Sequence, residues 1–299
     1  MGPTGTGKSD LAVAAALRLG GEVVNADSMQ VYRGLAIGTA APGPDQLAAV
    51  PHHLFGCLDP DEEPDAGWYA RTAAAAIRDL ASRGRVPIVV GGTFFWMRAL
   101  FSGLDDIPEV PAGVRDSVRA DLAREGPAAL HARLAAIDPE TASRLRPGDS
   151  QRVSRAIEVL LATGRPLSSF QLGGGRPAID ADVLRVAVEL PRAALYARIE
   201  ARVDRMIAAG IEDEVRAVLD AGHSPDCRPL RASSLAPVVR RVRGEIGAAG
   251  MRAAVAQSHR TYAKRQETWL RREEGLVRVD ARDPEGALGV MAAPVSGGG

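Results

Sequence analysis

The period of the hydrophobic pattern changes along the chain. Apolar residues at helical spacing predict helices over 8–19 and, with many alanines, over 67–83. Short apolar runs predict strands at 22–26 and 86–90, and the second run is continuous, as in a parallel strand buried on both faces. Because strands and helices alternate, this part of the chain predicts a parallel sheet with helical crossovers.

A stretch without a strand pattern follows. Helical patterns fill it, over 112–125, 127–137 and 149–163. Proline-rich residues precede these patterns and a glycine run follows them, as at the borders of an inserted domain. We therefore expect an all-helical domain over 108–182, inserted into a core made of 1–107 and 183–299.

The alternating pattern returns at Val183 to Leu190, which predicts a strand. The next helix carries an apolar stripe and, beside it, a stripe with Arg198, Arg202 and Arg205. Later patterns predict helices near 234–250 and 252–272, a strand at 276–279 and a disordered tail at 296–299.

Composition narrows the class of protein. The chain has 299 residues, of which 46% are apolar and 25% charged. Its longest uncharged apolar run, Val86 to Met97, is shorter than the ~18 residues that a membrane span needs. Cys57 and Cys227 fit neither a disulfide framework nor a zinc site. We expect a cytoplasmic monomer that does not bind membranes.

Overall neutrality conceals an uneven distribution of charge. The chain has 37 basic and 37 acidic residues, and Lys8 and Lys264 are the only lysines. The segment 228–272 holds ten arginines and Lys264 against Glu245 and Glu267, a net charge of +9. Such a segment is either a solvated helix face balanced by acids elsewhere or the electrostatic footprint of a site for RNA or phosphate. The acidic run 59–65 predicts a solvated loop.

A phosphate-binding motif opens the chain. The pattern G-x-x-x-x-G-K-S/T is matched by Gly2, Pro3, Thr4, Gly5, Thr6, Gly7, Lys8 and Ser9. The glycines let backbone N–H groups converge on phosphate oxygens, Lys8 adds a positive charge, and the Ser9 hydroxyl can bind Mg²⁺. The fold class predicted is α/β, a P-loop NTPase-like parallel sheet with helices on both faces and an inserted helical domain.

Further motifs lie where predicted strands end. Asp27 follows one strand, and Gly91-Gly92-Thr93 follows another, at the sheet edge where ligands bind in open α/β folds. Together with Pro51-His-His-Leu54, Gln151-Arg-Val-Ser-Arg155 and Tyr262-Ala-Lys-Arg-Gln-Glu-Thr-Trp-Leu-Arg271, these segments resemble the tRNA dimethylallyltransferase family. The resemblance covers almost the whole chain, in the same order.

The resemblance implies transfer of a dimethylallyl group from dimethylallyl diphosphate, with Mg²⁺, to N6 of adenine 37 in the anticodon stem-loop of tRNA. It assigns Asp27 as the base, Arg202 to the diphosphate and Thr93 to the reaction centre. The positions that it assigns to tRNA are Asp27, Ser28, Met29, Gln30, Thr93, Arg115, Gln151, Arg152, Val153, Ser154 and Arg155. It leaves His52, His53 and Trp269 as structural residues.

The chain departs from the family pattern in three places. Gly92-Thr-Phe-Phe-Trp96 is bulkier than the usual Gly-Thr-Gly-Leu-Tyr, and Ser234-Leu235 replaces a Gly-Tyr pair. The phosphate loop also starts at the second residue, whereas a strand should precede it. These departures leave open a catalytically impaired RNA-binding relative. The phosphate loop by itself also leaves open a P-loop small-molecule kinase, which would not explain the basic segment or the helical insertion. We expect the DNA upstream of Met1 to encode an apolar, β-branched run of about five residues.

Overall fold

The computed structural model describes residues 1–171 and 175–293, which form two compact units. The first unit, the core unit, comprises Met1–Phe101 and Ala178–Gly299, and the second, the helical unit, comprises Ser102–Pro177. The helical unit begins and ends a few residues earlier than the expected range of 108–182. The tail at 296–299 lies outside the described residues.

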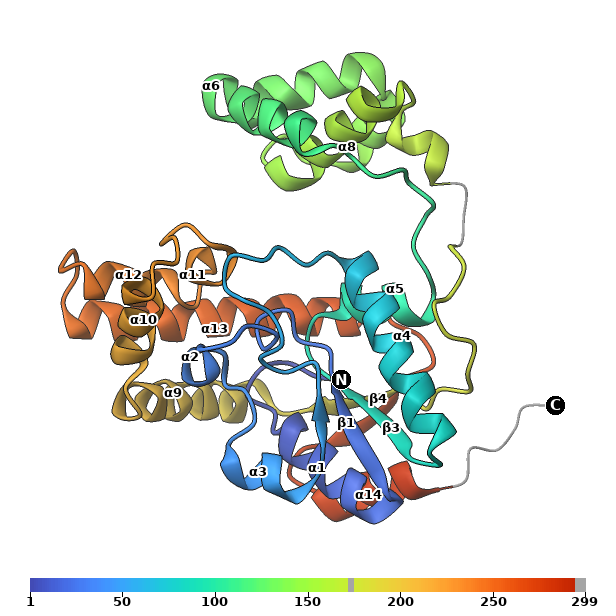
Figure 1. The fold of residues 1–299 in the computed structure, drawn as a ribbon, viewed down its shortest axis with the longest axis vertical. Coiled ribbons are helices and arrows are strands. Elements are labelled where there is room, and N and C mark those ends of the chain that lie inside the picture. Colours follow the sequence, from blue (N-terminus) through green and yellow to red (C-terminus); the bar gives the residue numbers. More distant parts are fainter. Residues whose placement is uncertain (172–174, 294–299) are drawn as a thin grey trace. The chain divides into compact units, whose positions relative to one another are not determined.

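The strands of the core unit form parallel ladders (Figure 1). In one ladder, β1 (Gly21–Asn25) lies between β2 (His52–His53) and β3 (Val86–Val90). In the other, β4 (Val186–Glu189) pairs with β5 (Val277–Asp280). The predicted α/β fold with a parallel sheet is confirmed, although β4 begins at Val186 and not at Val183.

Helices connect and cover these strands. The helices of the core unit are α1 (Lys8–Leu19), α2 (Ala36–Thr39), α3 (Pro44–Ala49), α4 (Ala66–Ser82), α5 (Phe94–Phe101), α9 (Arg192–Ala208), α10 (Ile211–Asp220), α11 (Arg228–Arg231), α12 (Ala236–Val242), α13 (Ala248–Leu270) and α14 (Pro284–Ala292). Both α1 and α4 pack on β1 and β3. The long helices α9 and α13 lie side by side (Figure 1).

The helical unit has its own hydrophobic core. It contains α6 (Ala112–Ile137), α7 (Pro139–Arg144), α8 (Ser150–Thr163) and the 3₁₀ helix η1 (Leu167–Phe170). At Gly126, which has a φ of 79° and precedes Pro127, α6 breaks into two segments. The break agrees with the separate helices predicted over 112–125 and 127–137, since proline cannot continue the hydrogen-bonding of the preceding helix.

The predicted boundary between the last two long helices was wrong. The sequence placed it between 250 and 252, but α12 ends at Val242 and α13 begins at Ala248. The chain turns at Gly244, whose φ of +75° few other residues adopt, and restarts after the extended residue Gly247. Three glycines lie close together in this segment, and sequence spacing alone did not identify which of them ends a helix.

The first residue of the chain pairs with β4. The Met1 amino group donates to Val186 O at 2.7 Å, and Val188 N–H donates to Met1 O at 2.9 Å. The opposite edge of β4 is also paired, since Val277 N–H donates to Arg185 O and Ala281 N–H donates to Glu189 O. A cavity of about 350 Å³ is lined by Met1 and by apolar residues of β3, β4 and α1. The existence of an upstream strand stays a prediction.

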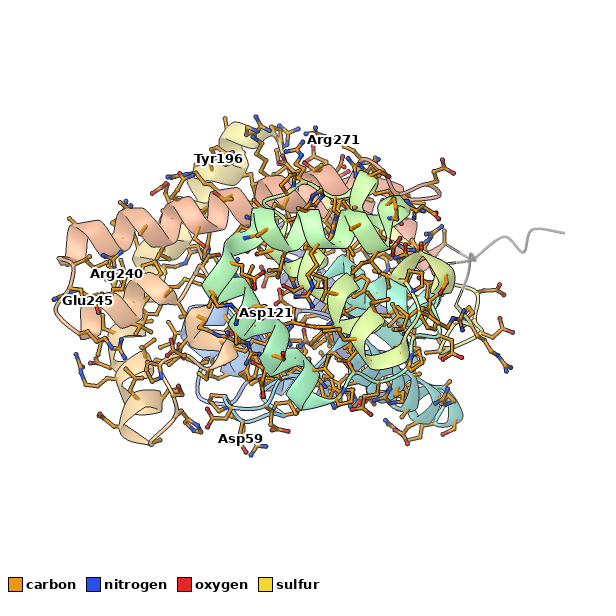
Figure 2. All side chains as sticks on the ribbon, turned by 90° about the horizontal axis from the view of Figure 1, so that it is seen from above. Asp59, Asp121, Tyr196, Arg240, Glu245 and Arg271 are labelled. Atoms are coloured by element: carbon orange, nitrogen blue, oxygen red, sulfur yellow. The ribbon has the colours of Figure 1, made fainter. Side chains whose placement is uncertain are left out.

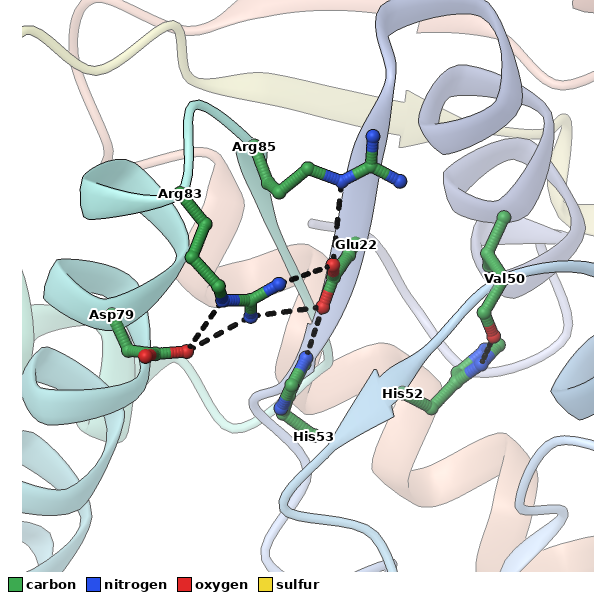
Figure 3. A network of polar contacts seen from close by, with 7 residues as sticks. All are labelled: Glu22, Val50, His52, His53, Asp79, Arg83 and Arg85. Carbon is green, nitrogen blue, oxygen red and sulfur yellow. Dashed lines mark hydrogen bonds and ion pairs between the residues drawn. The ribbon is translucent and has the colours of Figure 1, made fainter.

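A buried carboxylate ties β1 to its neighbours (Figure 3). Glu22 accepts hydrogen bonds from Arg83 at 2.9 Å and Arg85 at 3.4 Å, and His53 Nε2 lies 2.7 Å from its other oxygen. The hydrogen bonds from Arg83 and His53 lower the pKa of Glu22 to about 2. His53 therefore has the structural role expected of it, as has His52, whose Nδ1 lies 2.8 Å from Val50 O.

The depressed pKa of Glu22 predicts an acid-dependent stability. Ionised Glu22 stabilises the fold above its ordinary pKa of 4.5, and this contribution disappears as pH falls from 4.5 toward 2. We expect Glu22→Gln to cost about 2 kcal/mol at pH 7, an estimate reduced because the two arginines are partly exposed. Urea unfolding at pH 7, 5, 4 and 3 measures the difference, which should shrink with acidity.

The matched control is Glu285→Gln. Glu285 pairs with Arg18 at 3.9 Å and its side chain is 84% exposed, so its removal should change stability little at any of these pH values. A parent and a Glu22→Gln protein that differ by the same free energy at pH 7 and pH 3 would contradict the prediction.

Candidate active site

The loop of residues 2–9 folds back on itself before α1 begins. Gly5 and Gly7 have φ values of 89° and 86°, a region that other residues rarely occupy. Thr6 donates to Pro3 O through its backbone N–H at 3.4 Å and its hydroxyl at 2.9 Å. Gly7 precedes α1 and has no side chain to cap it, so the N–H groups of the first turn are available to an anion.

Helix α9 supplies arginines to the same loop. Arg202 donates to Thr4 Oγ1 at 2.8 Å, and Arg198 donates to Thr6 O at 3.2 Å. Leu195 and Ile199 of α9 also pack closely against the loop, because a Cβ added at Gly5 would lie 3.2 Å from each of their side chains. The family resemblance assigned Arg202 to the diphosphate and did not assign Arg198, although the two residues are one helical turn apart on the same stripe.

Two partly buried cations, Lys8 and Arg202, lie at this loop. Desolvation lowers the pKa of Lys8 to about 8, the Asp27 carboxylate opposes this shift, and Arg202 adds to it. Burial likewise lowers the pKa of Arg202, again opposed by Asp27. An anion bound here would restore the favourable environment of both cations, so the site is electrostatically suited to a phosphate or diphosphate.

Asp27 is held by the last residue of β1. Asn25, which is 0% exposed, accepts from Asp27 N–H at 2.8 Å and donates to Asp27 O at 3.0 Å and Leu54 O at 2.9 Å. Asp27 Oδ1 accepts from Met29 N–H at 3.0 Å, which fixes the carboxylate while Oδ2 remains able to accept a proton. Asn25 was not predicted; a lone amide at the end of an apolar strand is the signal that could have revealed it.

Thr93 lies at the same sheet edge as Asp27, as predicted from the strands that precede the two residues. Its N–H donates to Ala26 O at 3.1 Å, and its hydroxyl oxygen accepts from Ser28 N–H at 2.9 Å. A Cβ on Gly91 would lie 2.1 Å from Ala26 O, so only glycine permits this approach of the two strand ends. The structure thus brings together Asp27, Ser28 and Thr93.

Gln30, for which a tRNA contact is expected, has a structural role in its loop. Its side-chain amide donates to Thr39 O at 3.0 Å and Ala40 O at 2.8 Å, which leaves only its oxygen available to an RNA base. Met29 is partly buried in the same loop.

In the helical unit, the expected RNA contacts divide into two groups. Gln151, Arg152 and Arg155 are exposed on α8. Val153 is 0% exposed in the hydrophobic core, so its side chain cannot contact RNA, and its inclusion is corrected here. The buried Ser154 hydroxyl faces the interior for the same reason of helical periodicity. Arg115 is exposed, and its guanidinium donates to Val110 O at 3.0 Å.

Acidic residues pair with six of the arginines in the basic segment 228–272, and all of these acids except Glu245 and Glu267 come from other segments. The pairs are Arg231–Glu63, Arg240–Glu245, Arg241–Glu212, Arg252–Asp204, Arg260–Glu200 and Arg271–Glu267. Figure 2 labels Arg240 and Glu245, which lie together. Within residues 1–171 and 175–293, the basic residues of this segment without an acidic side chain within 4.0 Å are Arg228, Arg243, Lys264, Arg265 and Arg272.

The acidic run 59–65 forms a loop that also makes contacts with another segment. Asp61 lies 2.7 Å from His223 Nδ1, Glu63 pairs with Arg231 at 3.0 Å, and the Pro64 carbonyl accepts from Arg228. These contacts join the loop to the segment around α11, while the acidic side chains themselves are exposed, which confirms the expected solvated loop.

The fold and site together define an α/β protein with a cationic loop suited to a phosphorylated substrate, at the carboxyl edge of a parallel sheet and beside a carboxylate. An IPP transferase family model matches residues 30–273, and an isopentenyl transferase model matches residues 1–53. The chain belongs to the IPP transferase family.

Relatives match nearly the whole chain. Curated tRNA dimethylallyltransferases of Phenylobacterium zucineum and Geobacter sulfurreducens are 47% and 44% identical to it, over 95% and 93% of this chain and 92% and 90% of theirs. The full-length tRNA isopentenylpyrophosphate transferase of Bacillus halodurans superposes with a TM-score of 0.67 at 31% identity, covering 97% of this chain and 94% of its own. A eukaryotic dimethylallyltransferase acting on tRNA superposes with a TM-score of 0.72 at 25% identity, and the match covers 94% of this chain and 72% of that protein.

The pKa of Lys8 predicts how diphosphate binding depends on pH. The ammonium form of Lys8 attracts the anion and the neutral amine does not, so affinity for inorganic diphosphate should fall above the Lys8 pKa of about 8. The fall should be at most about tenfold per pH unit, because Arg202 still attracts the anion. Titration calorimetry between pH 6.5 and 9.5 measures this. In Lys8→Met the decline should vanish, whereas Lys264→Met should retain it; a Lys8→Met protein with the parent's pH profile would rule out Lys8 as the titrating group.

Proposed function

We propose that the protein transfers the dimethylallyl group of dimethylallyl diphosphate to N6 of adenine 37 in tRNA. Family membership over almost the whole chain supports this proposal. The observation in the structure that carries it is the contact of Arg202 with Thr4 at 2.8 Å, because it joins a cation to a phosphate loop that lies near the Asp27 carboxylate. The reaction of a prenyl diphosphate with an amine needs both groups, a cation for the diphosphate and a carboxylate to accept the proton of the amine.

The phosphate loop would hold the leaving group. As the bond between the prenyl C1 and oxygen breaks, the electron pair leaves with the diphosphate, whose growing charge Lys8, Arg202 and the first-turn N–H groups of α1 stabilise. None of these groups must move during the reaction, because the loop and α9 already fix them. Preorganised charge of this kind is the largest contribution to many enzymatic rates.

The site also fits Mg²⁺. No hydrogen bond within the described residues engages the Ser9 hydroxyl, and the same residues contain no group of three or more His, Cys, Asp or Glu side chains suited to a metal. A single hydroxyl suits Mg²⁺, which binds mainly phosphate oxygens and water at such sites. When bound, the ion would neutralise charge on the diphosphate.

Asp27 would accept the proton of the nucleophile. The exocyclic amine of adenine attacks C1, a C–N bond forms, and the N6 proton passes to Asp27 Oδ2, which Met29 N–H leaves unoccupied by binding Oδ1. The exposed Gln151, Arg152 and Arg155 of α8 would bind the anticodon stem-loop through base edges and phosphates, as proteins bind single-stranded RNA loops.

The two alternatives make different predictions for substrate use. A P-loop kinase, which the relatives do not favour, would consume ATP, and an impaired RNA-binding relative would bind tRNA and consume neither substrate. Incubation with tRNA and either dimethylallyl diphosphate or ATP, followed by quantification of both, separates the three. We expect consumption of dimethylallyl diphosphate with prenylation of adenine; consumption of ATP alone would overturn the proposal.

Asp27→Asn tests the base directly. The amide keeps an oxygen for Met29 N–H and therefore the loop conformation, but it accepts a proton far more weakly. We expect single-turnover prenyl transfer to fall by roughly 10²-fold with tRNA affinity unchanged. Asp45→Asn, at an exposed position of α3, serves as the control. Transfer within a few-fold of the parent rate would exclude Asp27 as the base.

The pairing of arginines predicts a moderate salt dependence of tRNA binding. If about four basic side chains of 228–272 neutralise phosphates, log affinity should fall with log salt at a slope of about −3, whereas all nine net charges would give about −6. Arg243→Gln should reduce the slope by about 0.7. Arg240→Gln is the matched control, since Arg240 already pairs with Glu245 at 3.3 Å. A salt-independent affinity would mean that this segment does not contact RNA.

A further inference from the structure

One buried amide on α13 bonds to both loops of the site. Gln266 is 2% exposed, its Oε1 accepts from Thr4 N–H at 2.8 Å, and its Nε2 donates to Gly92 O at 3.0 Å. Thr4 belongs to the phosphate loop, and Gly92 immediately precedes Thr93. A single side chain thus spans the loop that would hold the diphosphate and the loop beside Asp27.

The chemistry of this bridge is specific to an amide. It needs one acceptor and one donor on the same planar group, which glutamine provides and which leucine or ionised glutamate does not. The approach is also close, because a Cβ on Gly92 would lie 2.0 Å from Gln266 Nε2. The glycine at position 92 and the glutamine at position 266 therefore form a matched pair.

The two ends of the bridge differ in how much they depend on Gln266. Gly92 O receives a second hydrogen bond, from the Tyr262 hydroxyl at 3.2 Å, one helical turn earlier on α13. Thr4 N–H has Gln266 as its partner among the described residues. Loss of the amide would thus leave a partly buried N–H without its partner, a penalty that favours displacement of the phosphate loop.

We propose that Gln266 is a positioning residue, which sets the distance between the diphosphate held by residues 2–9 and the reaction centre at Asp27 and Thr93. The proposal rests on the proposed function. Gln266 touches neither substrate; it acts through Thr4 and Gly92. A displacement of about 1 Å between reacting groups lowers a rate about 10²-fold, so a bridge between these loops has a direct effect on the chemical step.

The first experiment compares Gln266→Leu with Gln257→Leu, an exposed glutamine on the same helix. For Gln266→Leu we expect single-turnover transfer to fall about 10²-fold, affinity for inorganic diphosphate to fall about tenfold, and tRNA affinity to stay within twofold. Gln257→Leu should match the parent in all three. A Gln266→Leu protein with parental transfer and diphosphate affinity would overturn the proposal, as would an equal loss of tRNA affinity, which would indicate general unfolding.

The second experiment uses Gln266→Glu, whose protonated carboxyl has one donor and one acceptor, like the amide. Burial opposite the Gly92 carbonyl should raise the pKa of this carboxyl. Diphosphate affinity relative to the parent should therefore recover as pH falls from 8 to 5.5, while the ratio for Gln266→Leu stays constant. If the diphosphate affinity of Gln266→Glu relative to the parent did not change with pH either, the proposed role of the Gln266 hydrogen bonds would be contradicted.

Diphosphate binding is measured without prenyl transfer, so the two proposals can fail separately. A parent protein without transferase activity would refute the proposed function, and the binding comparison would still test Gln266.

Discussion

The parallel pairing of β1 with β3 places the catalytic candidates Asp27 and Thr93 side by side. Asn25 stands opposite Val90 in the ladder, so the residues that follow both strands emerge at one edge. The pairing continues beyond the strands, because Ala26 N–H donates to Val90 O at 2.7 Å and Ala26 O accepts from Thr93 N–H at 3.1 Å. Asp27 and Thr93 are therefore neighbours through backbone geometry, before any side chain contributes.

Charge is distributed to match this geometry. The acids of α9 and α10 pair with the bases of α12 and α13, as in Arg252–Asp204 and Arg241–Glu212. Such partly exposed pairs add little stability, but they remove positive charge from most of the basic segment. The cations near Asp27, Lys8 and Arg202, differ because desolvation lowers the pKa of each. Unbalanced positive charge thus remains where an anion would bind.

Local patterns in the sequence predicted the parts of the site that are contiguous in the chain. The phosphate loop, Asp27 and Gly91-Gly92-Thr93 each combine a turn signal with a strand or helix next to it, so their places at the sheet edge followed. Gln266 could not be predicted in this way, since its partner Thr4 is 262 residues away and its role appears only when α13 packs against both loops. The assignment of Val153 failed for the converse reason, because a motif was transferred without considering which face of α8 is buried.

The aromatic residues that depart from the family pattern support the same loop. Trp96 stacks on Tyr69 with ring centres 4.5 Å apart, and Phe94 stacks on Trp269 of α13 at 5.2 Å. Only Phe95 of these three successive residues is exposed, at 54%. Trp269 follows Gln266 by three residues, so the two lie near each other on α13. The helix therefore holds the segment around Thr93 by a polar bridge at Gly92 and an apolar stack at Phe94, so two of the three bulky residues pack against neighbouring helices.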